Sequence, residues 1–417
     1  MAVRCFLALP ARVAKDECMT QETGSNGGPG TLSGYTVLEL GGFITGPLCT
    51  MLMADLGAEV IKVEDRRGDP FRPHEQGLYS PSFRAFNRNK KSMTLDLRSQ
   101  EGRKIFLQLV ERADGVVENF RPGTVDRLGV GYETLHEVNP RLVYLSINGF
   151  GNSGPQHLRP SVDAIGQAAS GLMSLLVDGD DLKLRGTSFS DITTGIFSAY
   201  GLLAGLMARD RYGKGMKVEN SMLASTMAFV GHTFTNYFST GRIFEPGTRA
   251  QIAQIFPLKA GDGKLLTIQI AGREKFWEFV TDAIGRPELR DDPRFKTRPD
   301  RVKNYDGLHG IFKDLFLEQP RDAWVDLMLR HDVPVSPIYS VNEVEDDPQV
   351  QFQDAFISLE HPIEGITKAV RNPILFSEAP ATYRMPPPAL GDHTEAILAD
   401  LGYNADRVAA LREAQVI

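Results

Sequence analysis

Short apolar runs and helically spaced apolar residues alternate along the first half of the chain. The run Tyr35–Leu40 predicts a buried strand. A glycine-rich turn follows it, and the spacing then predicts a helix over Leu48–Leu56 that ends at Gly57. Glu59–Val63 predicts a second strand. Strand, helix and strand within about 30 residues form a βαβ unit, which indicates a parallel sheet and an α/β fold.

The same alternation continues as far as a long helix. Further strands are predicted at Met93–Leu97, Asp114–Glu118 and Leu142–Ser146, with a helix over Gln100–Glu111. Apolar residues between Ile192 and Leu206 have helical spacing and predict a helix that begins at Asp191. Gly195, Gly201 and Gly205 lower the propensity of that helix, so we expect another backbone to pack closely against them.

The second half of the chain predicts a smaller α+β unit. Its predicted elements are a helix over 224–238, a hairpin of strands 256–260 and 265–270, helices over 275–284, 305–317 and 321–331, and a strand-rich stretch over 356–375. We expect four parts: a disordered extension over 1–31, a large α/β domain over 32–220, a small α+β domain over 221–340, and a return segment over 341–417 that completes the large domain.

Composition narrows the class of protein. The 417 residues carry a net charge of −7, which argues against a nucleic-acid-binding protein. Cys5, Cys18 and Cys49 show no metal-binding spacing, and their odd number fits a reducing cytoplasmic setting without a metal site. No apolar run approaches the roughly 20 residues that cross a bilayer, so we expect no membrane partner. The first residues resemble a weak signal segment, and Met19 is an alternative start to Met1.

The turn after the first predicted strand allows a test for a dinucleotide fold. Glu64 lies about where the ribose-binding acid of such a fold would be. The glycines, however, read GGxxxGP instead of GxGxxG, and Pro47 removes an N–H group that a pyrophosphate would use. The pattern therefore argues against an NAD-binding site. Arg66 and Arg67 follow the second strand and either meet phosphates there or form a solvated loop.

Two aspartates at predicted helix starts are the candidates for chemistry. Asp191 lies where an N-cap belongs, and the helix dipole there favours a carboxylate, so we expect Asp191 to be ionised at neutral pH. It is either a helix cap alone or a carboxylate nucleophile on a rigid helix start. Asp163 precedes a predicted small-residue helix over Ala164–Leu172 and presents the same choice between a cap and a functional acid.

Seven stretches in a shared order resemble a known family. They are GPLCTMLMADLGAEVIKVE, NRNKKSMTLDL, VVENFRPGTVDRLGVGYETL, NPRLVYLSINGFGNSGP, VDAIGQAASGLMS, YGKGMKVENSM and GDHTEAILADLGY. Together they resemble the class III (CaiB/BaiF) CoA-transferases, such as formyl-CoA transferase and carnitine CoA-transferase, from about Leu32 to the carboxyl terminus. The resemblance implies a Rossmann-like large CoA-binding domain, a smaller α+β domain, and an interlocked homodimer in which each chain threads through a ring made by the other.

The resemblance also implies a set of site residues. Asp191 matches the catalytic nucleophile, and Asp163 matches a supporting acid that is Glu in formyl-CoA transferase. The matching CoA-binding positions are Ile44, Thr45, Arg66 with Arg67 nearby, Leu95, Asn119, Phe120 and Arg127. No prosthetic group is implied, since coenzyme A and acyl-CoA are substrates. Pro246–Gln251 occupies the region of the family's glycine-rich lid without its glycine run.

The implied activity is transfer of CoA from an acyl-CoA donor to a carboxylic acid through a covalent aspartyl-CoA thioester. The alternative activity in the superfamily is acyl-CoA racemisation, which uses a His directly before the Asp163 position. Here that residue is Val162, which cannot transfer a proton. A third possibility is a CoA-binding homologue without catalysis. A second carboxylate on a substrate such as succinate could pair with Arg185, Arg242 or Arg249, each of which also fits a surface role.

Overall fold

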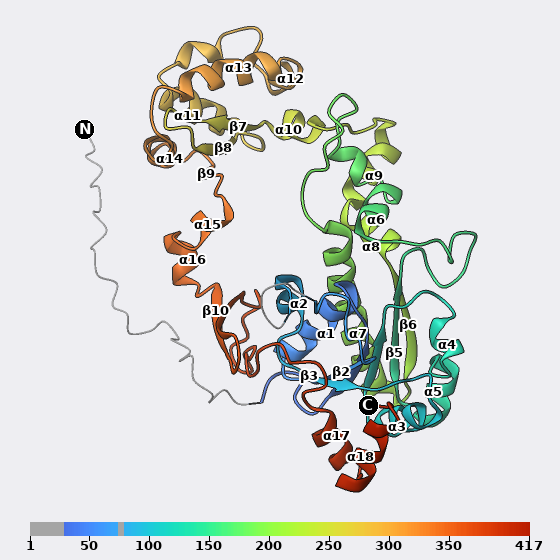
Figure 1. Cartoon of the computed structure of the whole chain (residues 1–417). Helices are drawn as coiled ribbons and strands as arrows, with labels where there is room; N and C mark the ends of the chain where they lie inside the picture. The colour runs from blue at the N-terminus through green and yellow to red at the C-terminus, as the bar shows by residue number, and fades with distance from the viewer. Residues whose placement is uncertain (1–28, 74–78) are drawn as a thin grey trace.

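The structure, a computed structural model, describes residues 29–73 and 79–417. The predicted extension over 1–31 and the choice between Met1 and Met19 lie almost wholly outside these residues. The described chain forms a ring, with a parallel sheet in the lower part and a smaller α+β body in the upper part (Figure 1). The division predicted at residues 220 and 340 stays a prediction, and "large domain" and "small domain" below refer to it.

The large domain is built on six strands in the order β3-β2-β1-β4-β5-β6, and every neighbouring pair is parallel. The strands are β1 (Thr36–Leu40), β2 (Glu59–Glu64), β3 (Lys90–Thr94), β4 (Gly115–Glu118), β5 (Val143–Asn148) and β6 (Met216–Ser221). From the middle of the sheet, β1, β2 and β3 follow one another toward one edge, and β4, β5 and β6 follow one another toward the other edge. The gap between the ends of β1 and β4 is therefore a topological switch point, where open α/β sheets bind their ligands.

Helices cover both faces of this sheet, which is why its inner strands β1, β4 and β5 are buried and largely apolar. The helices of this part are α1 (Thr45–Asp55), α2 (Pro81–Phe86), α3 (Gln100–Val110), α4 (Thr124–Arg127), α5 (Tyr132–Val138), α6 (Asp163–Ala169), α7 (Phe189–Tyr212), α17 (Thr394–Asp400) and α18 (Ala405–Glu413). Neighbouring residues on β1 face opposite cores: Val37 packs with Met53 and Leu202, and Leu38 packs with Phe106 and Leu398. The carboxyl-terminal helices thus complete one core of the large domain.

The small domain has a separate core made largely of aromatic side chains. A three-stranded antiparallel sheet, β7 (Ile255–Lys259), β8 (Leu265–Gln269) and β9 (Val335–Pro337), is covered by α10 (Thr248–Ala253), α11 (Lys275–Ala283), α12 (Arg298–Lys303), α13 (Tyr305–Phe316) and α14 (Arg321–Arg330). Trp277, Phe312 and Trp324 are buried in its centre. The predicted hairpin across Gly261–Gly263 is confirmed by the antiparallel pairing of β7 and β8.

Two separate segments link the domains and close the ring (Figure 1). One contains α8 (Met222–Phe229) and α9 (Gly231–Thr240). The other contains α15 (Val341–Val344), α16 (Pro348–Phe352) and the hairpin of β10 (Phe356–His361) and β11 (Gly365–Val370). Short 3₁₀ turns lie at Met173–Leu175 and Pro287–Arg290.

Several predicted boundaries were wrong. Strand β3 begins at Lys90, three residues before the predicted Met93, because the charge of Lys90 is buried against an ion-pair partner. The predicted helix over 224–238 is two helices, which meet at Val230. Helix α1 begins at Thr45 instead of Leu48.

Helix α7 packs more closely through its glycines than other residues would allow. A Cβ atom at Gly195 would lie 2.8 Å from the Leu48 side chain, and one at Gly205 would lie 2.7 Å from the Val143 side chain. The close packing is therefore confirmed, but side chains and not a backbone fill the space. By length and composition α7 could span a membrane, yet it packs against α1, β5 and β6 within the large domain.

Candidate active site

The residues expected to bind CoA follow the carboxyl ends of four parallel strands. Ile44 and Thr45 follow β1, Arg66 follows β2, and Leu95 follows β3 directly. Asn119, Phe120 and Arg127 follow β4, the last at the end of α4. Because parallel strands end at the same edge of a sheet, the structure brings these positions to one edge, and the turns after β1 and β4 flank the switch point.

Asn119 joins the two turns at the switch point. Its Nδ2 donates hydrogen bonds to the Gly42 carbonyl (2.8 Å) and to Thr45 Oγ1 (2.9 Å). Its Oδ1 accepts one from the Gly42 N–H (3.0 Å). The Asn119 amide therefore fixes the turn before α1, which supports its predicted place in the site.

Asp191 lies at the same edge of the sheet. Gly195, one turn after Asp191, packs on Leu48 near the start of α1. Further along α7, Leu202 approaches Gly115, the first residue of β4, and Arg209 forms an ion pair with Asp114 (2.6 Å). The carboxyl end of α7 thus lies near the starting ends of the strands. Its amino end, with Asp191, lies near their carboxyl ends.

Asp191 is not the N-cap that the sequence predicts. Helix α7 begins at Phe189, so Asp191 is its third residue. Asp163 supplies the cap instead: its Oδ1 accepts hydrogen bonds from the N–H groups of Ser190 (3.0 Å) and Asp191 (3.1 Å). Asp163 is itself the first residue of α6, after Val162. Asp163 therefore accepts hydrogen bonds from N–H groups at the start of α7, the helix that carries Asp191.

The expected ionisation of Asp191 is also corrected. Burial, followed by the negative charge of Asp163, raises the pKa of Asp191 to about 7. Both causes disfavour a carboxylate and outweigh the helix dipole on which the prediction depended. At neutral pH both the protonated and the ionised forms are populated. A carboxyl group with its pKa near the working pH and partly removed from water is typical of a functional site.

Gln167, which supports Asp163, and Gly166, which packs between α6 and α7, had not been singled out from the sequence. Gln167 Nε2 donates hydrogen bonds to Asp163 Oδ2 (2.6 Å) and to the Thr187 carbonyl (3.0 Å), which fixes the Asp163 carboxylate from the other side. A Cβ atom at Gly166 would lie 2.2 Å from Ser190 Oγ, so only glycine fits between α6 and α7 here. The spacing of Asp163 and Gln167, four residues apart on one helix, was the available signal.

The predicted basic residues of the CoA pocket are exposed. Arg66 Nη2 donates to Gln415 Oε1 (3.2 Å), and Arg67 forms an ion pair with Asp65 (2.7 Å). Arg127 Nη2 donates to Thr124 Oγ1 (3.2 Å). Exposed guanidinium groups at the carboxyl edge of a sheet suit phosphates, but here each has a side-chain partner, so these assignments stay predictions.

Leu95 differs from the basic residues, because its side chain is 1% exposed and belongs to the core. Only its main-chain atoms could contact a ligand.

Of the arginines considered for a second carboxylate, Arg185 forms an ion pair with Asp181 (3.0 Å), and the Arg242 guanidinium lies over the Phe244 ring. Their proposed contacts with substrate stay predictions.

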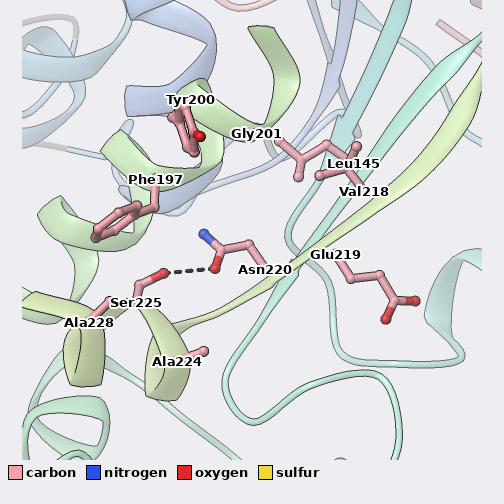
Figure 2. Close-up of a pocket in the computed structure, with 10 residues that line it drawn as sticks. All are labelled: Leu145, Phe197, Tyr200, Gly201, Val218, Glu219, Asn220, Ala224, Ser225 and Ala228. Carbon is pink, nitrogen blue, oxygen red and sulfur yellow. Dashed lines mark hydrogen bonds between the residues drawn. The ribbon is translucent and has the colours of Figure 1, made fainter. Parts of the chain in front are cut away.

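A separate pocket of about 240 Å³ lies on the outer edge of the sheet. Figure 2 shows its lining: Leu145, Phe197, Tyr200, Gly201, Val218, Glu219, Asn220, Ala224, Ser225 and Ala228, from β5, α7, β6 and α8. Ser225 Oγ donates to Asn220 Oδ1 (2.7 Å) across it. None of the predicted site residues lines this pocket. Within residues 29–73 and 79–417, no group of three or more His, Cys, Asp or Glu side chains could hold a metal ion.

Comparison with known proteins decides the family. Residues 32–394 match the family model described as CoA-transferase family III. The chain belongs to this family. The family III transferase is 37% identical to an acetyl-CoA:oxalate CoA-transferase from Acetobacter aceti over 79% of its own chain and 86% of that protein. It is 33% identical to a human succinyl-CoA:glutarate CoA-transferase over 93% and 90% of the two chains.

A solved structure agrees with the fold of the transferase. The crystal structure of a CaiB/BaiF family protein from Brucella suis covers 90% of this chain and all of its own, with 32% identity and a TM-score of 0.81. The predicted family and the α/β fold with its parallel sheet are thereby confirmed. The roles of individual residues rest on the geometry above and on the resemblance, and they are taken up as proposals.

Proposed function

We propose that the transferase moves CoA from an acyl-CoA donor to a carboxylic acid through a covalent intermediate on Asp191. The observation that carries this proposal is the placement of Asp191: a partly buried carboxyl group with a pKa raised to about 7, at the edge of the sheet that also carries the switch point. The alternative of a helix cap alone is weakened, because Asp163 supplies the cap.

The reaction has two matched halves. Asp191 Oδ attacks the thioester carbonyl carbon, the C–S bond breaks, and an acyl-aspartyl anhydride and CoA thiolate form. The thiolate attacks the Asp191 carbonyl carbon, the donor carboxylate leaves, and an aspartyl-CoA thioester remains. The acceptor carboxylate then attacks this thioester and expels the thiolate. The acceptor is now joined to Asp191 as a second acyl-aspartyl anhydride. The thiolate attacks the acceptor's acyl carbon in this anhydride, which releases the new acyl-CoA and the free Asp191 carboxylate. No proton is gained or lost overall.

The environment of Asp191 fits the difficult step in this sequence. A carboxylate with a pKa near 4 is a poor nucleophile against a leaving thiolate with a pKa of about 8.5. Raising the pKa of Asp191 to about 7 narrows that difference. Burial of the carboxyl group also limits water, which would hydrolyse the anhydride. Asp163 holds the main chain of Asp191 and, through its charge, contributes to the raised pKa.

The coenzyme itself is proposed to bind along the carboxyl edge of the sheet. The turns joined by Asn119 would hold the part of CoA nearest the thiol, with contacts from Ile44, Thr45 and Phe120. Arg66, Arg67 and Arg127 would meet phosphates, and Leu95 would contribute main-chain atoms. Exposed arginines suit the phosphate groups, which stay near solvent. No prosthetic group takes part, since CoA enters and leaves as substrate.

We propose short dicarboxylic acids as substrates. Relatives from Acetobacter aceti, Homo sapiens and Chloroflexus aurantiacus are named for oxalate, for succinyl-CoA and glutarate, and for succinyl-CoA and D-citramalate. Each is 33–37% identical to this chain. An arginine such as Arg242 or Arg249 would pair with the second carboxylate. Purified protein mixed with succinyl-CoA and a panel of monocarboxylic and dicarboxylic acids tests this. New acyl-CoA esters of dicarboxylic acids alone are expected, and transfer restricted to monocarboxylic acids contradicts the proposal.

We propose an interlocked homodimer as the working form. Helix α7 and the linking segment of α8 and α9 carry exposed apolar side chains: Phe197, Tyr200, Met207, Phe229, Tyr237 and Phe238. Large apolar side chains exposed on adjoining helices suit an interface, and two of them, Phe197 and Tyr200, also line the pocket in Figure 2. Light scattering should give twice the mass of the chain, and a stable monomer would contradict the arrangement.

The cysteine usage favours a reducing compartment such as the cytoplasm.

A further inference from the structure

Four charged side chains are fully buried beneath Gly41–Pro47, a segment made of the turn after β1 and the first turn of α1 and called the Gly41–Pro47 loop below. Glu39 comes from β1, Lys62 from β2, and Lys90 from β3. Asp69 comes from the segment after β2. All four side chains are inaccessible to solvent, and the two positive charges balance the two negative ones. The site assignments above include none of them.

Lys62 binds the beginning of the loop. Its Nζ lies 2.6 Å from Glu39 Oε1 and 2.9 Å from Asp69 Oδ2, which holds the ammonium group between two carboxylates. The same Nζ donates a hydrogen bond to the Gly41 carbonyl (2.7 Å). Lys62 thus fixes the first carbonyl of the loop to strand β2.

Lys90 binds the end of the loop. Its Nζ lies 2.8 Å from Glu39 Oε2 and donates hydrogen bonds to the Pro47 carbonyl (2.8 Å) and Asn87 Oδ1 (2.9 Å). Thr50, in the next turn of α1, also bonds to Glu39 and lies 3.2 Å from the Gly46 carbonyl. The single carboxylate of Glu39 therefore organises both ends of the loop through two lysines.

Asp69 holds the middle of the loop. Its Oδ1 accepts a hydrogen bond from the Phe43 N–H (3.2 Å). Phe43 has φ of 62°, in the left-handed region that a bulky residue avoids unless its surroundings enforce it. Its side chain is half-exposed and packs edge-on against Phe71, with 5.3 Å between ring centroids. Backbone strain of this kind gathers at ligand-binding sites.

Stability alone does not explain this cluster. Burying ions costs several kcal/mol each, and well-packed apolar residues in place of a buried ion pair are often as stable or more so. What apolar residues could not do is bond to the Gly41 carbonyl and the Pro47 carbonyl. We propose that Lys62 and Lys90, through Glu39, are positioning residues that hold the Gly41–Pro47 loop in the shape that binds CoA. This inference rests on the proposed function, which places CoA at that loop.

The test uses a charge-balanced double variant, Glu39→Gln with Lys90→Met, in the full-length protein. It removes one charge of each sign and the bond to the Pro47 carbonyl, and it retains side-chain volume. We expect KM for succinyl-CoA and the Kd for CoA, measured by calorimetry, to rise about tenfold or more, with kcat changed less than KM. Thr50→Val is a milder second variant, expected to raise both constants about 2- to 10-fold through loss of its hydroxyl bond.

The matched control is the buried pair Asp55 and Arg88, with N–O distances of 2.9 and 2.6 Å. Asp55 is the last residue of α1, at the end away from the loop. Asp55→Asn with Arg88→Met should lower Tm as much as the test variant does, but leave KM and Kd at their wild-type values.

The outcomes separate the inference from the function on which it rests. If the wild-type protein neither binds CoA nor transfers it, the proposed function fails. If the wild type is active and the double variant keeps wild-type KM and Kd, only the positioning role fails. Equal rises in the test and control variants would also overturn it, since general destabilisation would then explain both. If the double variant does not fold, wild-type KM and Kd in Thr50→Val would contradict the inference.

Discussion

The large and small domains bury different kinds of side chain. Under the edge of the large domain that is proposed to bind CoA (the binding edge), complete ion pairs are buried: Lys62 with Glu39, and Arg72 with Glu64 at 2.6 Å. In the small domain the core is aromatic, with Phe316 stacked on Trp324 at 4.4 Å, and its buried Arg301 pairs with an exposed Glu274. The large domain thus buries complete ion pairs, both beneath the turn after β1 and, with Asp55 and Arg88, at the far end of α1. The small domain buries the apolar surface that stabilises it.

The comparison predicts that changes at the binding edge alter chemistry and that changes in the small-domain core alter stability. The largest expected effect is that of Asp191→Ala. It should lower kcat for CoA transfer by at least about 10³-fold, because the covalent intermediate cannot form. Its Tm should stay near that of the wild type, because Asp163 still caps α7. Residual transfer above about a tenth of the wild-type rate would contradict the claim that transfer depends on Asp191.

The converse change lies in the small domain. Phe312 is fully buried and packs edge-on against Phe256, with ring centroids 4.9 Å apart. Phe312→Ala should lower the free energy of unfolding by about 3–5 kcal/mol, since it removes apolar burial and leaves a cavity. Measured well below its Tm, the variant should keep KM for acyl-CoA within about twofold of the wild type. A large rise in KM without loss of stability would contradict the division of roles.

A smaller effect should follow from Asp163→Asn, which changes the charge beside Asp191 and keeps an oxygen to accept its N–H. The proposed nucleophile is the ionised form of Asp191, so wild-type acylation should increase as the pH rises through about 7. Loss of the Asp163 charge lowers the pKa of Asp191 and moves this increase to lower pH. Stopped-flow measurement of thiol release from pH 5 to 9 checks it. A uniform loss of rate without a shifted profile would indicate a capping role alone.

The smallest effect is expected from Val162→His, which adds a base next to Asp163. Val162 is 66% exposed, so an imidazole should fit without loss of stability. Racemisation needs two groups that face an α-carbon from opposite sides, and one added His does not create that geometry. Exchange of α-protons into deuterated water, followed by NMR, should stay at background. Rapid exchange together with loss of CoA transfer would revive the racemase alternative.

Sequence patterns predicted most of the fold of the large domain, since its strands are covered on both faces and therefore read as apolar runs. The start of β3 was missed because Lys90 and Ser92 look like solvent-facing residues. Their burial depends on Glu39 and Glu64, on other strands, and such pairing is invisible to local periodicity. Strand β6 was missed because its exposed edge carries alternating polar residues.

The site was predicted less completely than the fold. The position of Asp191 followed from helical spacing and from the family resemblance. Its raised pKa did not, because burial and the Asp163 charge depend on how α6 and α7 pack. The spacing of Gln167, four residues after Asp163, was the available signal, but its bonds to Asp163 and to the segment before α7 depend on how α6 and α7 pack.

The central claim is that CoA becomes covalently attached to Asp191. The most direct measurement incubates the protein with succinyl-CoA, adds hydroxylamine to convert an aspartyl thioester or anhydride into a hydroxamate, and locates the modified residue by peptide mass spectrometry. Asp191→Asn is the matched control. We predict a hydroxamate on Asp191 that forms only when succinyl-CoA is present and is missing from the control. Transfer of CoA by the wild type without modification of Asp191, or the same modification elsewhere in both proteins, would contradict the mechanism.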